Sequence, residues 1–227
     1  MRWRVAFAKK ATREEMPQLA LGVPRGGIAR RTVLVGAAFA ALLRPRLALA
    51  AESPAAATRS FYDVLLRAMK GGERLGFAGR RELLAPACLR FFNFPLMTRL
   101  MVGPQWPQLP PDQQKQLAES FSAFSIATYA NRFDDYSGER FDVENEPSAL
   151  ANGDTIVKSQ LVQGDGDKVE LDYLMRQDNG WRTIDVYLSG TVSELATRRS
   201  EFSSVLRRGG PSALVELLQR KVAELSG

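Results

Sequence analysis

The sequence contains no histidine and only one cysteine, Cys88, among its 227 residues. Without histidine, a Ser-His-Asp or Cys-His nucleophile and a histidine-ligated zinc site are excluded. One cysteine can build neither an intrachain disulfide nor a thiolate metal site. Because apolar residues flank Cys88 in "PACLRFF", we expect it to be a small core residue. Any catalysis would have to use carboxylate, lysine, tyrosine or hydroxyl side chains.

Long apolar runs are scarce as well. The run Val33–Leu43 has eleven residues, too few to span ~30 Å of hydrocarbon as a helix. It lies in a basic segment and is followed by Ala48-Leu49-Ala50, the small-x-small pattern that signal peptidase accepts. We therefore predict that residues 1–50 are an export signal peptide, cleaved after Ala50. The alternatives are an uncleaved amphipathic arm or a misplaced start codon, and Arg30-Arg31 leaves Sec and twin-arginine export both open.

Removing this segment reverses the net charge. The whole chain has 31 Lys and Arg against 25 Asp and Glu, a net charge of +6. The first fifty residues hold ten of the cations and two of the anions, so residues 51–227 carry 21 and 23, a net charge of −2. Binding to nucleic acid through phosphate neutralisation therefore loses its main support. No cysteine follows the cleavage point as a lipoprotein anchor.

Helical patterns occupy both ends of residues 51–227. Ser53 is predicted to cap a helix that ends at Gly71-Gly72, and a short helix is predicted over residues 78–84, before Pro86. The segment "CLRFFNFPLMTRLMVGPQW" is dense in large apolar residues, and it is either a buried core helix or a helix that contacts both core and ligand. A long helix is predicted from Asp112 to about Tyr136. The C-terminal helical region is interrupted at Gly209-Gly210.

Between these helices the apolar period changes to two residues. Strands are predicted in "ERFDVENEP", "DTIVKSQLVQ" and "KVELDYLMRQ", and a fourth from Trp181. Asn179-Gly180 suits the positive φ angles of a type I′ hairpin turn. The predicted fold class is α+β: a four-stranded antiparallel curved sheet, connected as a meander and covered by N- and C-terminal helices in a single domain, residues 51–227.

One carboxylate, Asp185, lies inside the last strand. Ile184, Val186 and Leu188 alternate with it, so Asp185 points away if their face lines an interior. A structural ion pair to Arg198 or Arg199 is then favoured over catalysis, because a general base needs an orienting partner. The alternative is a small-molecule enzyme with a cone-shaped pocket that uses Asp185 or Tyr187.

The remaining charged clusters are less informative. Asp134-Asp135, and Asp165 with Asp167, are expected to be solvated turn residues, because no calcium-loop spacing is present. The C-terminal pairs Arg198-Arg199 and Arg207-Arg208 are either a docking patch for anionic headgroups or a partner, or ordinary cations near helix ends. No metal site or cofactor is predicted.

Large apolar residues are abundant for a domain of this size. They form either a fully packed core or the wall of a cavity for acyl chains, and the pattern alone does not separate the two. If they form a cavity, the residues predicted to line it and to bind lipid are Phe94, Leu96, Met97, Leu100, Trp106, Phe121, Phe124, Tyr129, Val157, Leu171, Tyr173, Ile184, Val186, Leu188, Val192 and Phe202.

Several segments together resemble the MlaC-type carriers, also called toluene-tolerance proteins. They are "SIATYANRFDDYSGERFDV", "KVELDYLMRQDNGWRTIDVYLSG" and "VSELATRRSEFSSVLRRGG". The family pattern includes Tyr-x-Gly after the long helix, an "[YI]-D-[VM]" strand leading to Gly-Val-Ser, and an "RS-x-F" helix. Thr191 lengthens the Gly-to-Ser stretch by one residue. With the aromatic segment "FFNFPLMTRLM", it favours a hopanoid-associated, HpnM-like branch.

The resemblance implies a soluble, monomeric periplasmic carrier rather than an enzyme. Its ligand would be a phospholipid or hopanoid, whose hydrophobic part lies between a curved sheet and helices. Its partners would be an inner-membrane ABC transporter, through the substrate-binding component, and an outer-membrane lipoprotein complex. The resemblance implies neither nucleic-acid binding nor any cofactor.

Overall fold

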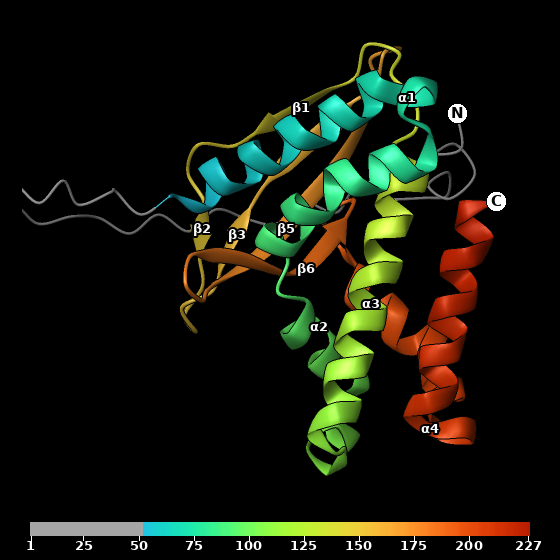
Figure 1. Cartoon of the computed structure of the whole chain (residues 1–227). Coiled ribbons are helices and arrows are strands. Elements are labelled where there is room, and N and C mark those ends of the chain that lie inside the picture. Colours follow the sequence, from blue (N-terminus) through green and yellow to red (C-terminus); the bar gives the residue numbers. More distant parts are fainter. Residues whose placement is uncertain (1–51) are drawn as a thin grey trace, which may run out of the picture. The chain divides into compact units, whose positions relative to one another are not determined.

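The structure is a computed structural model that describes residues 52–227, so the predicted signal peptide lies outside the described residues and stays a prediction. Helices and strands follow one another in three blocks, helical, β and helical (Figure 1). The helices are α1 (Pro54–Phe91), α2 (Phe94–Val102), the 3-10 helix η2 (Gly103–Gln108), α3 (Pro111–Arg132) and α4 (Glu194–Ser226). The strands are β1 (Arg140–Val143), β2 (Ser148–Ala149), β3 (Thr155–Val157), β4 (Ser159–Val162), β5 (Lys168–Gln177), β6 (Trp181–Leu188) and β7 (Val192–Ser193).

Helix α1 begins as predicted, and its first stretch ends at Gly71-Gly72 as predicted, although helix resumes beyond the kink. The Ser53 hydroxyl accepts a hydrogen bond from the Ala56 amide at 3.1 Å, and Pro54 occupies the first turn. Gly72 (φ 37°) and Gly76 (φ 59°) leave the helical conformation, and they divide α1 into a first arm, residues 54–71, and a second arm, residues 77–91. The predicted end of the short helix at Leu84 is wrong. The second arm continues through Pro86 because proline removes only one backbone donor, while Leu84 and Cys88 on either side are fully buried.

A buried arginine joins this kink to α3. Arg80 donates through Nε to the carbonyl oxygen of Ala130 at 2.8 Å and through Nη1 to that of Gly72 at 2.8 Å. One planar guanidinium therefore satisfies a carbonyl in the kink and another near the C-terminus of α3.

Arg80→Lys is expected to lower the free energy of unfolding by about 1 to 2 kcal/mol, because a lysine cannot bond both carbonyls in this geometry. Urea titration followed by circular dichroism measures the change. Arg81→Lys, at the exposed next position, is the matched control and is expected to leave stability unchanged. Equal unfolding midpoints for the two variants would show that the Arg80 bridge contributes nothing.

All of the strand pairs in the sheet are antiparallel, but the described residues form seven strands rather than the predicted four. Lys158 separates β3 from β4, and Pro147, which has no backbone donor, lies in the gap between β1 and β2. The short β7 adds to the edge at β6. Each of the four predicted segments still pairs with the next one along the chain. Strands β3 and β4 both pair with one edge of β5, and β6 pairs with the other edge of β5. Asn179 and Gly180 both have the expected positive φ angles.

A β-bulge changes which residues of β6 share a face. Val186 pairs with Tyr173 and Asp185 with Leu174, but the next pair is Thr183 with Met175, so Ile184 is the additional residue. The bulge places Thr183 on the same face as Val186, which simple alternation does not predict. The alternation argument for Ile184, Val186 and Leu188 therefore holds only for the last two residues.

The helices cover one face of this sheet. The hydroxyl of Thr58 on α1 contacts the sulfur of Met175, and the rings of Tyr62 and Phe141 stack at 4.0 Å. Helix α3 packs against α1, α2 and α4. It ends at Arg132 rather than near Tyr136, because Phe133 turns into the core and stacks on Tyr129. None of the helices described is both long and apolar enough to cross a membrane.

Candidate functional site

The apolar interior lies between the inner face of the sheet and the helices. Where α1 covers β3 and β5, Val157 and Met175 are 0% exposed. On β6, Val186 is 8% and Leu188 7% exposed, so both are buried as well. Apolar side chains of α2, α3 and α4, for example Met97, Phe124 and Leu206, are buried to a similar degree. Because α2 and α4 both contact β6 and α3 packs against both of these helices, the interior extends among these four elements.

A connected network of aromatic rings fills the centre. Neighbouring ring centroids lie 4.0 to 6.4 Å apart, in stacked, tilted and edge-to-face pairs that are favourable for aromatic side chains. Phe61 stacks on Phe91 at 4.4 Å and meets the edge of Tyr129 at 5.6 Å. The network consists of Phe61, Tyr62, Phe91, Phe92, Phe94, Phe121, Tyr129, Phe133, Phe141 and Tyr173.

Tyr129 combines a deep position with remaining accessible surface. Burial raises the pKa of its hydroxyl well above the ordinary value, and the rings of Phe61, Phe92 and Phe133 surround it. The residue is nevertheless only half-buried.

The sixteen predicted residues divide by exposure. Eleven are buried in the described structure: Phe94, Met97, Phe121, Phe124, Val157, Leu171, Tyr173, Ile184, Val186, Leu188 and Phe202. Leu96, Trp106 and Tyr129 are half-buried. Leu100 is 41% and Val192 52% exposed, so the structure does not bring these two together with the others.

Six members of the aromatic network are missing from the predicted set: Phe61, Tyr62, Phe91, Phe92, Phe133 and Phe141. Phe61 and Phe141 already lie on predicted apolar faces, which gives a usable signal. Phe91 and Phe92 are adjacent, and no regular helix or strand turns two consecutive residues to one side. Both are buried because α1 ends between them and the chain changes direction, which only tertiary structure determines.

The polar groups described in this interior are poorly suited to proton transfer, and the buried Thr183 hydroxyl has no hydrogen-bond partner among the described residues. The hydroxyls of Tyr62 and Ser159 are hydrogen-bonded at 2.6 Å, and Ser159 donates in turn to the Leu171 carbonyl oxygen. Burial raises the pKa values of Tyr62 and Tyr173, so both remain protonated at neutral pH. Burial also raises the pKa of the Cys88 thiol to about 12, which fits the prediction of a core residue. Among the residues described, no group of acidic or cysteine side chains could hold a metal ion.

Asp185 connects β6 to the beginning of α4. Its carboxylate accepts hydrogen bonds from the Ser193 hydroxyl at 2.6 Å, the Leu195 amide at 3.0 Å and its neighbour Val186 at 2.8 Å. The predicted ion pair with Arg198 or Arg199 is wrong, because these donors at the N-terminus of α4 occupy the carboxylate instead. By register Asp185 lies on the face opposite Val186, as predicted, so the geometry gives it no route to the interior.

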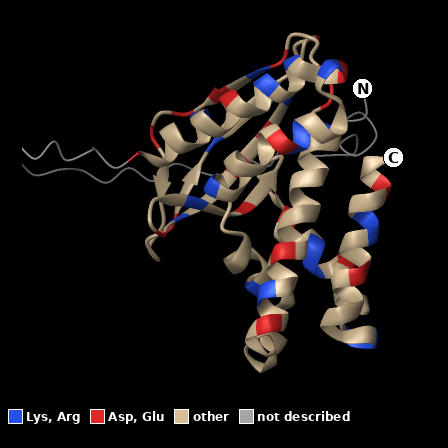
Figure 2. Cartoon of the chain, in the orientation of Figure 1, with Lys and Arg blue, Asp and Glu red and all other residues tan. Residues whose placement is uncertain are grey.

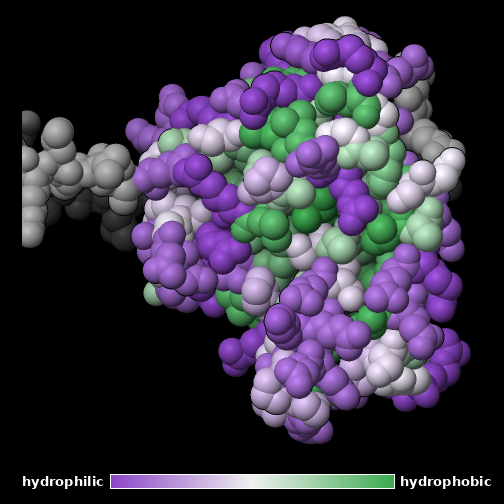
Figure 3. Space-filling view, in the orientation of Figure 1, coloured by the Kyte–Doolittle hydropathy of each residue, from purple (hydrophilic) through white to green (hydrophobic). Residues whose placement is uncertain are grey.

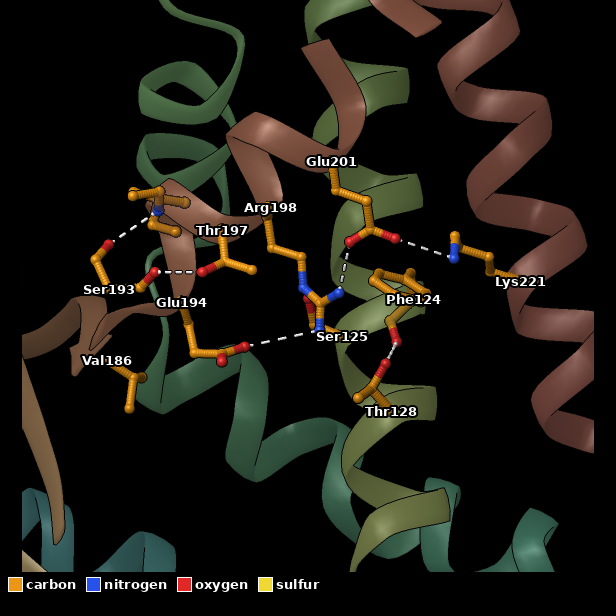
Figure 4. Close-up of polar contacts among 12 residues, drawn as sticks. Phe124, Ser125, Thr128, Val186, Ser193, Glu194, Thr197, Arg198, Glu201 and Lys221 are labelled. Carbon is orange, nitrogen blue, oxygen red and sulfur yellow. Dashed lines mark hydrogen bonds and ion pairs between the residues drawn. The ribbon is translucent and has the colours of Figure 1, made fainter. Parts of the chain in front are cut away.

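A chain of alternating charges crosses the end of the interior at α4 (Figure 4). Arg198 lies between Glu194 at 3.7 Å and Glu201 at 2.8 Å, and Glu201 also pairs with Lys221 at 3.1 Å. The guanidinium carbon of Arg198 is 5.4 Å from the centroid of the Phe124 ring. Although burial raises the pKa of Glu201, hydrogen bonds from Arg198 and Lys221 lower it overall. Figure 4 shows Glu194 and Arg198 between β6, which carries Val186, and α3.

The four C-terminal arginines therefore have different environments. Arg198 is held in the charge chain, whereas Arg199, Arg207 and Arg208 are exposed. The Arg199 guanidinium also lies close to Gly103, where an added Cβ would be 3.1 Å from its Nη2. They do not form one uniform basic patch.

Helices over one face of an open antiparallel sheet, with an apolar interior between them, define a fold that is known to bind phospholipid. A solved structure of the phospholipid-binding protein from Ralstonia solanacearum, in complex with a phospholipid, matches this chain with a TM-score of 0.67 and 26% sequence identity. The match covers 77% of this chain and 99% of that one.

The family follows from the sequence itself. Residues 59–220 match the family described as MlaC protein, and the chain belongs to this family. The match includes all four α-helices, at least in part, and every strand. No curated protein matches the chain.

Proposed function

We propose that this protein is a periplasmic lipid carrier, which buries the acyl chains of a phospholipid between the inner face of the sheet and α2, α3 and α4. The observation that carries the proposal is the phospholipid complex of the structurally similar protein, which aligns over 99% of its length. Val186 and Leu188, which are buried on the inner face of β6, provide an apolar wall at the same location in this chain. The bound lipid is cargo, and the proposal requires no catalytic step.

The chemistry of the proposed site suits apolar cargo. Each methylene group removed from water contributes about 0.8 kcal/mol, so two acyl chains can be held without a polar contact. The charges at the edge, Glu194, Arg198, Glu201 and Lys221, sum to zero and bond one another. A headgroup at that edge would meet no net charge, so the proposed carrier distinguishes lipids mainly by their hydrophobic part.

Transport extends the proposal beyond binding. In the MlaC-type scheme the loaded carrier would move between an outer-membrane lipoprotein complex and an inner-membrane ABC transporter. The family match, the structural match and the predicted export signal support this scheme. A hopanoid is the alternative cargo, suggested by the aromatic segment before residue 102.

Lipid is expected to co-purify with the protein after expression with its export signal. Intact-complex mass spectrometry should show a mass increase equal to one lipid, and organic extraction should release the same species. The lipid mass distinguishes a two-chain phospholipid from a pentacyclic hopanoid. Transfer of a fluorescent phospholipid between two vesicle populations, faster with the protein than without it, would establish the carrier step.

The control is the same protein after delipidation and refolding, which is expected to bind added phospholipid again. Protein that is folded, free of lipid as purified and unable to take up phospholipid or hopanoid would contradict the proposed function.

A further inference from the structure

A groove at the surface of α1 is distinct from the proposed lipid site among β6, α2, α3 and α4, although Phe61 and Phe91 of the aromatic network line it. It lies between the two arms of α1 and has a volume of about 350 Å³. Its apolar wall includes Phe61 and Val64 from the first arm and Leu83 and Ala87 from the second. Trp181, the first residue of β6, lies at the same groove. Figure 3 shows hydrophobic surface over both arms of α1, bordered by hydrophilic residues.

The groove has a border of net charge +1, because Arg67, Arg90 and Glu52 all line it. Arg67 of the first arm and Arg90 of the second both line it, and both are exposed. The Arg90 guanidinium pairs with Glu52 at 2.6 Å, at the edge where the first arm begins. The surroundings have the same sign, because α1 holds seven Lys and Arg against three Asp and Glu, a net charge of +4 (Figure 2). The β region, residues 140–188, has five cations and ten anions, a net charge of −5.

The shape of the groove indicates which kind of partner it fits. Two helical arms joined by a kink leave a furrow between their side-chain ridges, into which the ridge of a third helix packs. A bilayer surface instead requires apolar side chains that protrude, so that they reach the boundary between headgroups and acyl chains. Here Phe61 is 2% exposed and Val64, Leu83 and Ala87 are half-buried, so the apolar surface is recessed.

We propose that the groove between the arms of α1 docks an amphipathic helix of a partner protein, with apolar side chains on one face and acidic residues beside them. The apolar face would contact Val64, Leu83 and Ala87, in the manner of other helix-in-groove complexes. The acidic residues would approach Arg67 and Arg90. Complementary charge of this kind raises the association rate and selects the partner.

The test uses the full chain and a synthetic 18-residue helical peptide as the probe. The peptide carries Leu at positions i, i+3, i+4 and i+7 and Glu at the flanking positions, with a fluorescein label for anisotropy. Arg67→Glu is expected to weaken binding about five- to tenfold, because it places a like charge beside the peptide. Val64→Asp, which puts a carboxylate in the floor, is expected to weaken binding more than about tenfold.

Arg74→Glu is the matched control, because it makes the same charge change at an exposed position of α1 that does not line the groove. Its affinity should equal that of the unaltered chain, and a peptide with Lys in place of Glu should bind at least about fivefold more weakly. Circular dichroism confirms that each variant is folded. Equal losses in Arg67→Glu and Arg74→Glu would overturn the proposal. The proposal would also be overturned if the acidic peptide did not bind. A third contrary result would be that the protein binds anionic phosphatidylglycerol vesicles, that Val64→Asp abolishes this binding and that the peptide does not compete with the vesicles.

Discussion

A carboxylate at position 186 is expected to abolish lipid loading. Val186 is opposite Tyr173 on the inner face of the sheet, and its side chain is buried. An ionised glutamate there would be buried beside acyl chains without a partner, which costs several kcal/mol. The measurement is lipid occupancy of purified Val186→Glu by intact-complex mass spectrometry, with an expected reduction of more than about tenfold. Leu188→Glu, further along the same face, is expected to behave alike.

The matched control is Val192→Glu, which makes the same change where the side chain is 52% exposed. Val192 belongs to the predicted lipid-binding residues, so this variant also tests that prediction. Occupancy is expected to stay at the level of the unaltered protein, because an exposed glutamate remains hydrated. Thermal unfolding separates loss of loading from loss of fold. Folded Val186→Glu and Leu188→Glu with full occupancy would place the ligand somewhere other than this wall.

Removal of the Asp185 carboxylate is expected to destabilise the protein by about 2 to 4 kcal/mol, although no catalytic role is assigned to it. Asp185→Ala leaves the Ser193 hydroxyl and the Leu195 amide without their acceptor at the beginning of α4. The carboxylate also stabilises the positive end of the α4 helix dipole. Urea unfolding monitored by tryptophan fluorescence measures the change in the free energy of unfolding.

Two further variants separate the contributions to this effect. Asp185→Asn retains an acceptor oxygen and is expected to lose about half as much stability as the alanine variant. Asp142→Ala removes an exposed carboxylate from the same sheet, and it is expected to change stability by less than about 1 kcal/mol. If Asp185→Ala were no less stable than Asp142→Ala, the carboxylate would not be the link between β6 and α4.

Much of the α+β organisation follows from short-range patterns. Ser53 and Pro54 begin α1, and the alternation in "KVELDYLMRQ" predicts the long strand β5. Asn179-Gly180 makes the turn that joins β5 to β6. These signals are local, because each depends on the backbone conformation of a few residues or on which face of a single helix or strand they occupy. The number of strands was wrong, since interruptions at Lys158 and Pro147 depend on how neighbouring strands fit one another.

The candidate site was less accessible to sequence reasoning. Leu100 and Val192 are as apolar as Val186, yet both are exposed. Whether an apolar side chain is buried depends on which other element covers it in the folded protein. The bulge at Ile184 changes the face of Thr183, and a bulge is set by pairing with β5. The partners of Asp185 lie eight and ten residues later, at the beginning of α4, and alternation within one strand contains no information about them.

The sequence by itself therefore determined the absence of histidine chemistry, the order of helices and strands and the resemblance to MlaC proteins. Tertiary structure alone decided that Phe91 and Phe92 both enter the aromatic network, and that Asp185 caps a helix instead of pairing with an arginine. It also decided that the two arms of α1 enclose an apolar groove with a border of net charge +1. The physical reason is that residue type and periodicity fix local conformation, whereas burial and hydrogen-bond partners depend on segments that meet only after folding.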